Sequence, residues 1–252
     1  MTRSPKRHPL RMMGRLVRLG LGPNPAPDCV TQSYDRISAG YDRTWTSHMR
    51  DLSSALIDRL GPLSGAAALD LTCGTGFVTG LLAERTGRGC VGVDRSEGMI
   101  ARARVSHGTC EFWVSDIQAY LDACEPGRFD VVTCAWGLGY SRPLAVLRAV
   151  RRVLGPGGRV AIIDNTLLSL NRVMRASFLT FMERPEALKR LMRFRFLLGA
   201  GHLNLWFRLA GFRPEFAEAG QRSYTVPSGT EAIERLRATG AAAGFEYACV
   251  GR

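Results

Sequence analysis

The stretch Ala68-Leu-Asp-Leu-Thr-Cys-Gly-Thr-Gly-Phe77 decides how the rest of the chain is interpreted. An apolar run carries a carboxylate, Asp70, into a glycine turn, and a helical pattern begins directly after the turn. Gly74 and Gly76 allow the backbone to turn sharply and to approach a ligand closely, which side chains at these positions would prevent. The stretch therefore predicts a strand, a turn and a helix that together cradle a cofactor.

The spacing of the glycines argues against a dinucleotide cofactor. A dinucleotide loop has the pattern Gly-x-Gly-x-x-Gly, whereas three residues separate Gly76 from Gly80. A carboxylate at Asp70 would also repel a pyrophosphate in a poorly hydrated cleft. The stretch favours a cationic ligand instead.

Further strand-like segments follow at regular intervals, with helical patterns between them. They cover residues 90–94, 112–116, 129–136 and 159–164, and the last one comes after a helical pattern at 147–154 and a Gly-Pro-Gly-Gly turn. Strands that alternate with helices predict an α/β fold. We expect a Rossmann-like, doubly wound, mostly parallel sheet with helices on both faces and a helical cap inserted after the fifth strand.

The motifs of residues 34–165, and the order in which they occur, resemble those of the class I S-adenosylmethionine-dependent methyltransferases. The family pattern Asp-x-Gly-Cys-Gly-Thr-Gly is matched except that Thr72 replaces the first glycine, and we expect Thr72 to take a negative φ. The doubled Tyr-Asp of residues 34–42 resembles the helical lead-in of the ubiquinone and menaquinone biosynthesis methyltransferases. The resemblance implies S-adenosyl-L-methionine as the cofactor.

The resemblance also assigns cofactor contacts. It implies that Asp94 accepts hydrogen bonds from both ribose hydroxyls, that Met99 lines the adenine and that Asp116 meets the adenine amino group. For Asp94, a surface acid is the alternative. Tyr34 or Tyr41 would close over the methionine end, or else pack as an aromatic against the sheet. The expected cofactor-binding residues are Tyr34, Tyr41, Asp70, Thr72, Cys73, Gly74, Gly76, Asp94, Arg95, Met99, Asp116, Ile117, Ala135 and Trp136.

Methyl transfer depends mainly on aligning the nucleophile with the methyl group and the departing sulfur. A phenol or carbon acceptor would need a base, and the candidate catalytic residues are His48 and Tyr140, with His202 as a further histidine. Each of the two histidines could instead be structural or surface-exposed. Trp136 and Tyr140 could wall the acceptor site or pack in the core. We assign no metal ligands.

The positive charge of the chain lies outside the expected core. The net charge is +12 at pH 7, and residues 1–27 hold six basic residues and no acidic one. Residues 166–213 hold nine basic and two acidic residues. We expect a basic N-terminal tail (1–30) with the composition of an amphipathic helix, a cofactor-binding core with its helical lead-in (31–165), a helical lid (166–213) and a C-terminal completion of the core (214–252). In this last part we expect a helix over 230–239 and strands at 222–226 and 244–250.

Both basic regions also contain large apolar residues. The composition suits a helix lying on an anionic membrane surface, and a solvated tail with an ordinary lid is the alternative. For residues 166–213 we favour a lid over the strand ends, which implies a hydrophobic small-molecule substrate. Nucleic acid is a less favoured partner because the fourth strand ends in Cys-Ala-Trp-Gly and lacks an Asn/Asp-Pro-Pro-Tyr/Phe element.

The seven cysteines include no Cys-x-x-Cys pair, and no apolar run is long enough to span a membrane. We expect a cytoplasmic protein, or one peripheral at the inner membrane face, that methylates a quinone precursor, lipid or secondary metabolite at an oxygen, carbon or nitrogen. Two alternatives stay open: a non-catalytic S-adenosylmethionine-binding regulatory or scaffold protein, for which Thr72 is the hint, and an RNA methyltransferase.

Overall fold

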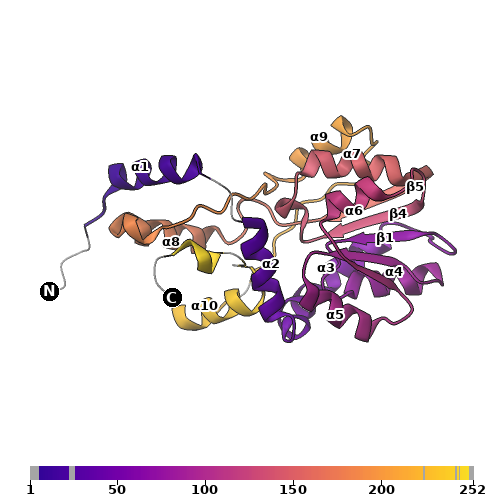
Figure 1. Cartoon of the computed structure of the whole chain (residues 1–252), viewed down its shortest axis with the longest axis horizontal. Helices are drawn as coiled ribbons and strands as arrows, with labels where there is room; N and C mark the ends of the chain where they lie inside the picture. Colours follow the sequence, from indigo (N-terminus) through magenta and orange to yellow (C-terminus); the bar gives the residue numbers. More distant parts are fainter. Residues whose placement is uncertain (1–5, 23–25, 224, 242, 244, 250–252) are drawn as a thin grey trace.

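The expected strands form one parallel sheet in the computed structural model, which describes residues 6–22, 26–223, 225–241, 243 and 245–249. The strand order is β3-β2-β1-β4-β5, so the direction of winding reverses between β1 and β4 (Figure 1). Ligands of doubly wound sheets bind beyond the strand ends at such a reversal. The predicted fold class is confirmed. The strands are β1 (Ala68–Leu71), β2 (Val91–Asp94), β3 (Glu111–Val114), β4 (Phe129–Ala135) and β5 (Leu154–Ile163).

The register of the sheet brings the ends of the central strands level with one another. Leu71 pairs with Val93 of β2 on one side and with Cys134 of β4 on the other. The residues that follow β1, β2 and β4 therefore meet at one edge. These are the positions where the sequence places its glycine loop, an acid and Trp136.

Helices cover both faces of the sheet. On one face lie α3 (Ser47–Asp58) and α4 (Phe77–Thr86), whose Ile57 and Leu82 are fully buried with Val131 of β4. On the other face lie α6 (Ile117–Ala123) and α7 (Pro143–Val153), with α9 (Ala200–Leu209) packed outside α7 (Figure 1). Helix α5 (Glu97–Ser106) packs beside β2 and β3. The helix predicted at 147–154 thus begins four residues earlier, at Pro143, and ends at Val153.

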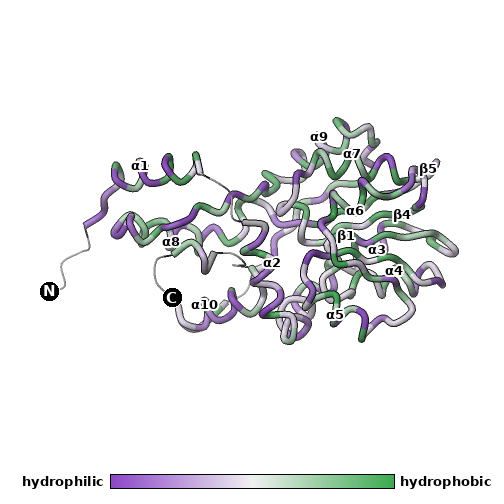
Figure 2. Tube along the Cα trace, in the orientation of Figure 1, coloured by the Kyte–Doolittle hydropathy of each residue, from purple (hydrophilic) through white to green (hydrophobic). Residues whose placement is uncertain are grey.

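A second group of elements lies away from the sheet (Figure 1). Helix α1 (Pro9–Gly20) packs along α8 (Asn171–Glu183), and Met12 of α1 is buried against Leu188 and Ala248. Arg15 donates from Nε to the carbonyl oxygen of Leu188 at 2.8 Å, so this helix is anchored by a polar contact as well. Figure 2 shows that α1 alternates hydrophilic and hydrophobic residues along its length. We call α1, α8 and the turn η3 (Pro185–Ala187) the outboard part.

The remaining elements connect these two parts. Helix α2 (Ala26–Ile37) packs against α5, and the lead-in continues through a turn, η1 (Asp42–Thr46), into α3. A 3₁₀ turn, η2 (Leu138–Tyr140), follows β4, and α10 (Gly229–Ala238) packs against η1. Helix α10 is the helix predicted at 230–239.

The expectation of C-terminal strands was wrong for the described residues. Phe245–Ala248 forms a 3₁₀ turn, η4, and the described positions of 222–226 lie in no strand. Gly244 and Val250, the ends of one predicted strand, and Tyr224 in the other lie outside the described residues. A short apolar run fits a strand and a helical turn equally, so the pattern could not decide between them. No helix in the described part of the chain has the length and apolar character needed to cross a bilayer.

Candidate functional site

A cavity of about 50 Å³ lies where β1 and β4 end, between the glycine loop and the lead-in. Half of the expected cofactor-binding residues line it: Tyr41, Asp70, Thr72, Cys73, Gly74, Ala135 and Trp136. They come from three separate stretches of the chain. The parallel register brings the stretches after β1 and β4 together, and Tyr41 comes from the lead-in. The cavity is also lined by Trp45, Ser53 and Phe77, which the sequence analysis did not single out.

Asp70 is completely buried at the end of β1. Its two carboxylate oxygens accept hydrogen bonds from the hydroxyls of Thr133, at 2.7 Å, and Thr79, at 2.8 Å. Burial raises the pKa of Asp70 to about 7, although the two hydroxyl donors act in the opposite direction. An acid poised in this way becomes a stable carboxylate when a cation arrives beside it.

Asp94 ends β2 and is held by backbone amides. One oxygen accepts from the amide of Gly74 at 3.0 Å, and the other accepts from the amide of Ser96 at 2.9 Å. Burial raises the pKa of Asp94, and these amide donors counteract the shift. Ser96 caps α5 by accepting from the Met99 amide at 3.1 Å, as the sequence predicts. The glycine loop and the second acid are therefore fixed relative to each other.

Thr72 corrects one of our expectations. Its φ is +55°, in the left-handed region, whereas we predicted a negative value. The turn after β1 keeps the conformation that a glycine would adopt, and the threonine accommodates it by donating from Oγ1 to the Leu71 carbonyl oxygen at 2.6 Å. A β-carbon on Gly137 would lie 2.6 Å from that of Thr72, so the absence of a side chain at residue 137 makes room for the threonine.

Three tyrosines gather beside the glycine loop. The hydroxyls of Tyr34 and Tyr140 lie 3.2 Å apart, and the ring of Tyr34 meets that of Tyr41 edge to face at 5.9 Å. Burial raises the pKa of Tyr140 to about 12 and the pKa of Tyr34 and Tyr41 well above the usual value. A hydroxyl with so high a pKa stays protonated at neutral pH, so these groups act as hydrogen-bonding groups rather than as bases.

The segment after β5 adds an apolar wall to this cluster. Phe194 packs on Tyr140 with ring centres 5.5 Å apart, and Phe196 packs on Phe194 at 5.3 Å. The amide of Arg195 donates to the carbonyl oxygen of Gly139 at 2.9 Å and holds this segment against η2. Residues from the expected lid therefore lie against Tyr140, at the strand ends.

Asp164 is a half-buried acid that the sequence analysis did not select. It follows β5, and one of its oxygens accepts from the Gly139 amide at 2.8 Å. Burial raises its pKa to about 6, and its charge contributes to the raised pKa of Tyr140. The signal was available, because the fifth strand-like segment ends at Asp164 just as earlier segments end at Asp94 and Asp116.

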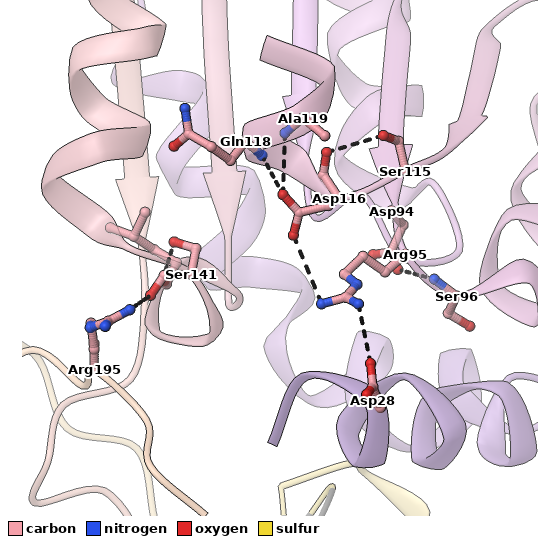
Figure 3. A network of polar contacts seen from close by, with 11 residues as sticks. Asp28, Asp94, Arg95, Ser96, Ser115, Asp116, Gln118, Ala119, Ser141 and Arg195 are labelled. Carbon is pink, nitrogen blue, oxygen red and sulfur yellow. Dashed lines mark hydrogen bonds and ion pairs between the residues drawn. The ribbon is translucent and has the colours of Figure 1, made fainter. Parts of the chain in front are cut away.

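Asp116 and Arg95 lie at the far end of this edge (Figure 3). Asp116 caps α6, since one of its oxygens accepts from the amides of Gln118 at 2.9 Å and Ala119 at 3.2 Å. Its other oxygen lies 3.8 Å from Arg95, which also reaches Asp28 of α2 at 3.5 Å. Asp116 thus has a structural partner at each oxygen, and its contact with adenine stays a prediction.

Three expected residues are tightly packed in this structure, and their cofactor contacts stay predictions. A β-carbon on Gly76 would meet the side chains of His107 at 2.8 Å and Phe112 at 3.2 Å, so this glycine permits the close approach of α4 to its neighbours. Met99 and Ile117 are buried in the hydrophobic interior.

The candidate histidines lie apart from the strand-end cavity. His48 lines a separate cavity of about 260 Å³ with Arg43 and Arg235. The pKa of His48 is lowered, mainly by burial and to a lesser extent by the charge of Arg235. His202 packs on Trp206 in α9 with ring centres 4.0 Å apart. Among the described residues, no group of His, Cys, Asp or Glu side chains is arranged to hold a metal ion.

Comparisons with known proteins agree with this geometry. A family model described as "Methyltransferase domain" matches residues 68–158. The chain is 37% identical over 151 residues to demethylmenaquinone methyltransferase of Lactococcus lactis, a match that covers 54% of this chain and 58% of that enzyme. It is 34% identical over 163 residues to ubiquinone biosynthesis O-methyltransferase of Pseudomonas aeruginosa, which covers 62% of this chain and 68% of that enzyme.

Among solved structures, the DhpI–SAH complex has the same fold. The TM-score is 0.55 at 23% sequence identity, and the match covers 73% of this chain and 87% of that one. The chain spans a little over half the length of the Lactococcus enzyme. The residues that the family model matches include the glycine loop.

Proposed function

We propose that this chain, which belongs to the class I S-adenosylmethionine-dependent methyltransferases, transfers the methyl group of S-adenosylmethionine to a hydrophobic small molecule. The observation that carries the proposal is the joint placement of the buried Asp70, the half-buried Asp94 and a glycine loop at the ends of β1 and β2. A sulfonium and an ammonium need anionic or electron-rich surroundings, and Asp70 is such a group in the cavity.

In this proposal each acid has its own task. Asp94 holds the ribose hydroxyls with its two oxygens, and the amides of Gly74 and Ser96 keep that carboxylate oriented. Asp70 faces the ammonium of the amino-acid end. The donor supplies the reactive methyl group, and the protein orients the acceptor in line with the sulfur and excludes water.

The apolar wall supports a hydrophobic acceptor. This wall consists of three aromatic rings in successive contact, Tyr140 of η2 with Phe194 and then Phe196 of the segment after β5. The names of the two curated relatives refer to demethylmenaquinone and to ubiquinone biosynthesis, so we propose an aromatic quinone precursor as the acceptor class.

Two measurements test the function. Calorimetric titration with S-adenosylhomocysteine should give one binding site per chain. Incubation with S-adenosylmethionine labelled in the methyl group should then transfer label to a reduced lipophilic quinone precursor in preference to catechol, a water-soluble phenol. A chain that binds neither form of the cofactor contradicts the proposal, and one that binds without transferring label to any lipophilic acceptor supports the scaffold alternative.

We also propose that the outboard part docks on an anionic membrane surface. Met12 faces inward and is 2% exposed, whereas Leu10, Met13 and Val17 are 88%, 61% and 58% exposed. These three residues recur at helical spacing on the face of α1 opposite Met12. Arg11 and Arg18 are exposed on the same helix, where they can meet lipid phosphates. Apolar side chains flanked by cations suit the headgroup boundary of an anionic bilayer.

Vesicle sedimentation tests the docking. The protein should bind vesicles containing phosphatidylglycerol more than vesicles of phosphatidylcholine alone, and added salt should reduce binding. The double substitution Leu10→Gln and Val17→Gln should lower the bound fraction severalfold. Val105→Gln is the matched control, because Val105 is 86% exposed on α5 of the core. Equal binding by the double variant and the wild type would contradict the docking proposal.

A further inference from the structure

The lead-in reaches the strand-end cavity through an unusual turn. Residues Asp42–Thr46 form one turn of π-helix between α2 and α3. Such turns are rare and occur frequently at functional sites. One oxygen of Asp42 accepts from the hydroxyl of Thr46 at 2.8 Å and from the hydroxyl of Thr75 in the glycine loop at 2.5 Å. The turn is therefore fixed to the loop, and so is the residue that it presents to the cavity.

That residue is Trp45, which lines the cavity. Its ring packs edge to face on Trp136 with centres 5.8 Å apart. The indole nitrogen of Trp136 donates to the Ser53 hydroxyl at 3.0 Å. The indole nitrogen of Trp45, by contrast, is buried and has no acceptor among the described residues. Leaving a buried N–H without an acceptor costs about 1–3 kcal/mol, so proteins rarely keep one without a reason.

The other polar groups of the cavity indicate which acceptor is missing. The Gly74 amide donates to Asp94, and the hydroxyls of Thr46 and Thr75 donate to Asp42. Among the described lining residues, Asp70 is the single charged side chain. An amino-acid group carries both an ammonium and a carboxylate. Asp70 matches the ammonium, and the indole N–H of Trp45 is a buried donor that is not already engaged and suits the carboxylate.

From this geometry we infer that the indole N–H of Trp45 donates a hydrogen bond to the carboxylate of the amino-acid end of the bound cofactor. The inference rests on the proposed function, and it adds a binding residue that recognises the zwitterionic end. A cavity of about 50 Å³ admits roughly three or four water-sized groups, which is enough for that end of the molecule but not for an adenosine. Hydrogen bonds to a charged acceptor are about twice as strong as neutral ones.

The test removes the donor and keeps the ring, by Trp45→Phe. Two ligands are compared by calorimetry: S-adenosylhomocysteine, and 5′-methylthioadenosine, which lacks the amino-acid group. The variant should bind S-adenosylhomocysteine about tenfold more weakly, as expected for one charge-assisted hydrogen bond, and should bind 5′-methylthioadenosine as the wild type does. Trp113→Phe is the matched control, because Trp113 is 48% exposed on β3 and donates to Glu111. This control should leave both affinities unchanged.

A second measurement uses the unaltered protein. The chain has four tryptophans, so its indole N–H signals are few enough to resolve by ¹⁵N NMR. The Trp45 signal should move on addition of S-adenosylhomocysteine and stay in place with 5′-methylthioadenosine. The inference would be overturned if Trp45→Phe lost affinity for both ligands equally or kept its affinity for both. It would also be overturned if the Trp45 indole signal did not move on addition of S-adenosylhomocysteine. A wild-type chain that binds neither ligand would instead overturn the proposed function.

Discussion

The strand-end site and the outboard part differ in whether the chain itself supplies contacts for their side chains. At the strand ends, Asp70 is buried and Asp94 is half-buried, and each of their oxygens accepts a hydrogen bond from within the chain. On α1, large apolar side chains such as Leu10 and Val17 are left in water with nothing described in the chain to cover them. In the first region the two acids find their hydrogen-bond donors within the chain, and for the second region we propose that a membrane surface covers the apolar face. Perturbations of one region should therefore leave the other unchanged.

The largest expected effect is on cofactor binding through Asp94→Ala. The variant loses both carboxylate oxygens for the ribose and also the acceptor of the Gly74 amide. Two charge-assisted hydrogen bonds correspond to at least about 100-fold in affinity for S-adenosylhomocysteine, measured by calorimetry. Vesicle binding should be unchanged. Asp122→Ala, at an exposed acid on α6, is the control, and wild-type affinity in Asp94→Ala would refute the ribose role.

The next effect concerns stability at the strand ends. Gly137→Ala places a β-carbon 2.6 Å from Thr72 and should cost about 2 kcal/mol in the free energy of unfolding, measured with urea. Thr72→Gly removes the obstructing side chain, so the double variant should recover most of the loss. Additive effects of the two substitutions would show that a side chain at residue 137 does not collide with Thr72.

A smaller effect follows from the pKa of Asp70, about 7. Because a cationic ligand favours the carboxylate, affinity for S-adenosylhomocysteine should fall severalfold between pH 7.5 and pH 6. Asp70→Asn should remove this dependence, although it also weakens binding. For the free energy of unfolding without ligand, the pH dependence has the opposite sign. The folded state holds the Asp70 proton more tightly than the unfolded state, so this group stabilises the protein at low pH, and its contribution is lost as pH rises from about 4 to about 7. A pH-independent affinity in the wild type would contradict the assignment.

The smallest expected effects are the losses of stability on removing two helix caps, one on α5 in the core and one on α10. Ser96 is buried, caps α5 and also donates to Asp35 of α2. Ser96→Ala should cost about 1–2 kcal/mol of global stability. Ser228 caps α10 by accepting from the Glu231 amide at 3.2 Å at an exposed site. Ser228→Ala should cost about 0.5 kcal/mol and reduce hydrogen-exchange protection in α10 alone. Equal loss of protection across the sheet in both variants would mean that α10 unfolds together with the core.

The sequence predicted what depends on local pattern. The glycine turn after Asp70, the cap at Ser96 and a sheet of five parallel strands all follow from residue types at fixed spacing, and the structure has each of them. The gathering of Asp70, Cys73 and Trp136 around one cavity follows in turn from the rule that parallel strands end at a common edge.

What failed depends on contacts between distant residues. The sign of φ at Thr72 is tolerated because Gly137 leaves space for its side chain, and no local pattern links residues 72 and 137. His48 belongs to the lead-in, but its side chain reaches a cavity shared with Arg235 instead of the strand ends. Trp45 gave no periodic signal, since the turn that presents it departs from the helical period.

The turn at residues 42–46 also gives the chain an exact length requirement. It holds one residue more than an α-helical turn, and each residue of an α-helix advances the side chains by about 100°. Deleting one residue here would let the turn join α3 as regular α-helix. Every side chain before the deletion would then swing by about a quarter turn relative to those after it. The lead-in would keep its composition and its helicity, yet offer a different row of side chains to whatever molecule enters from that side.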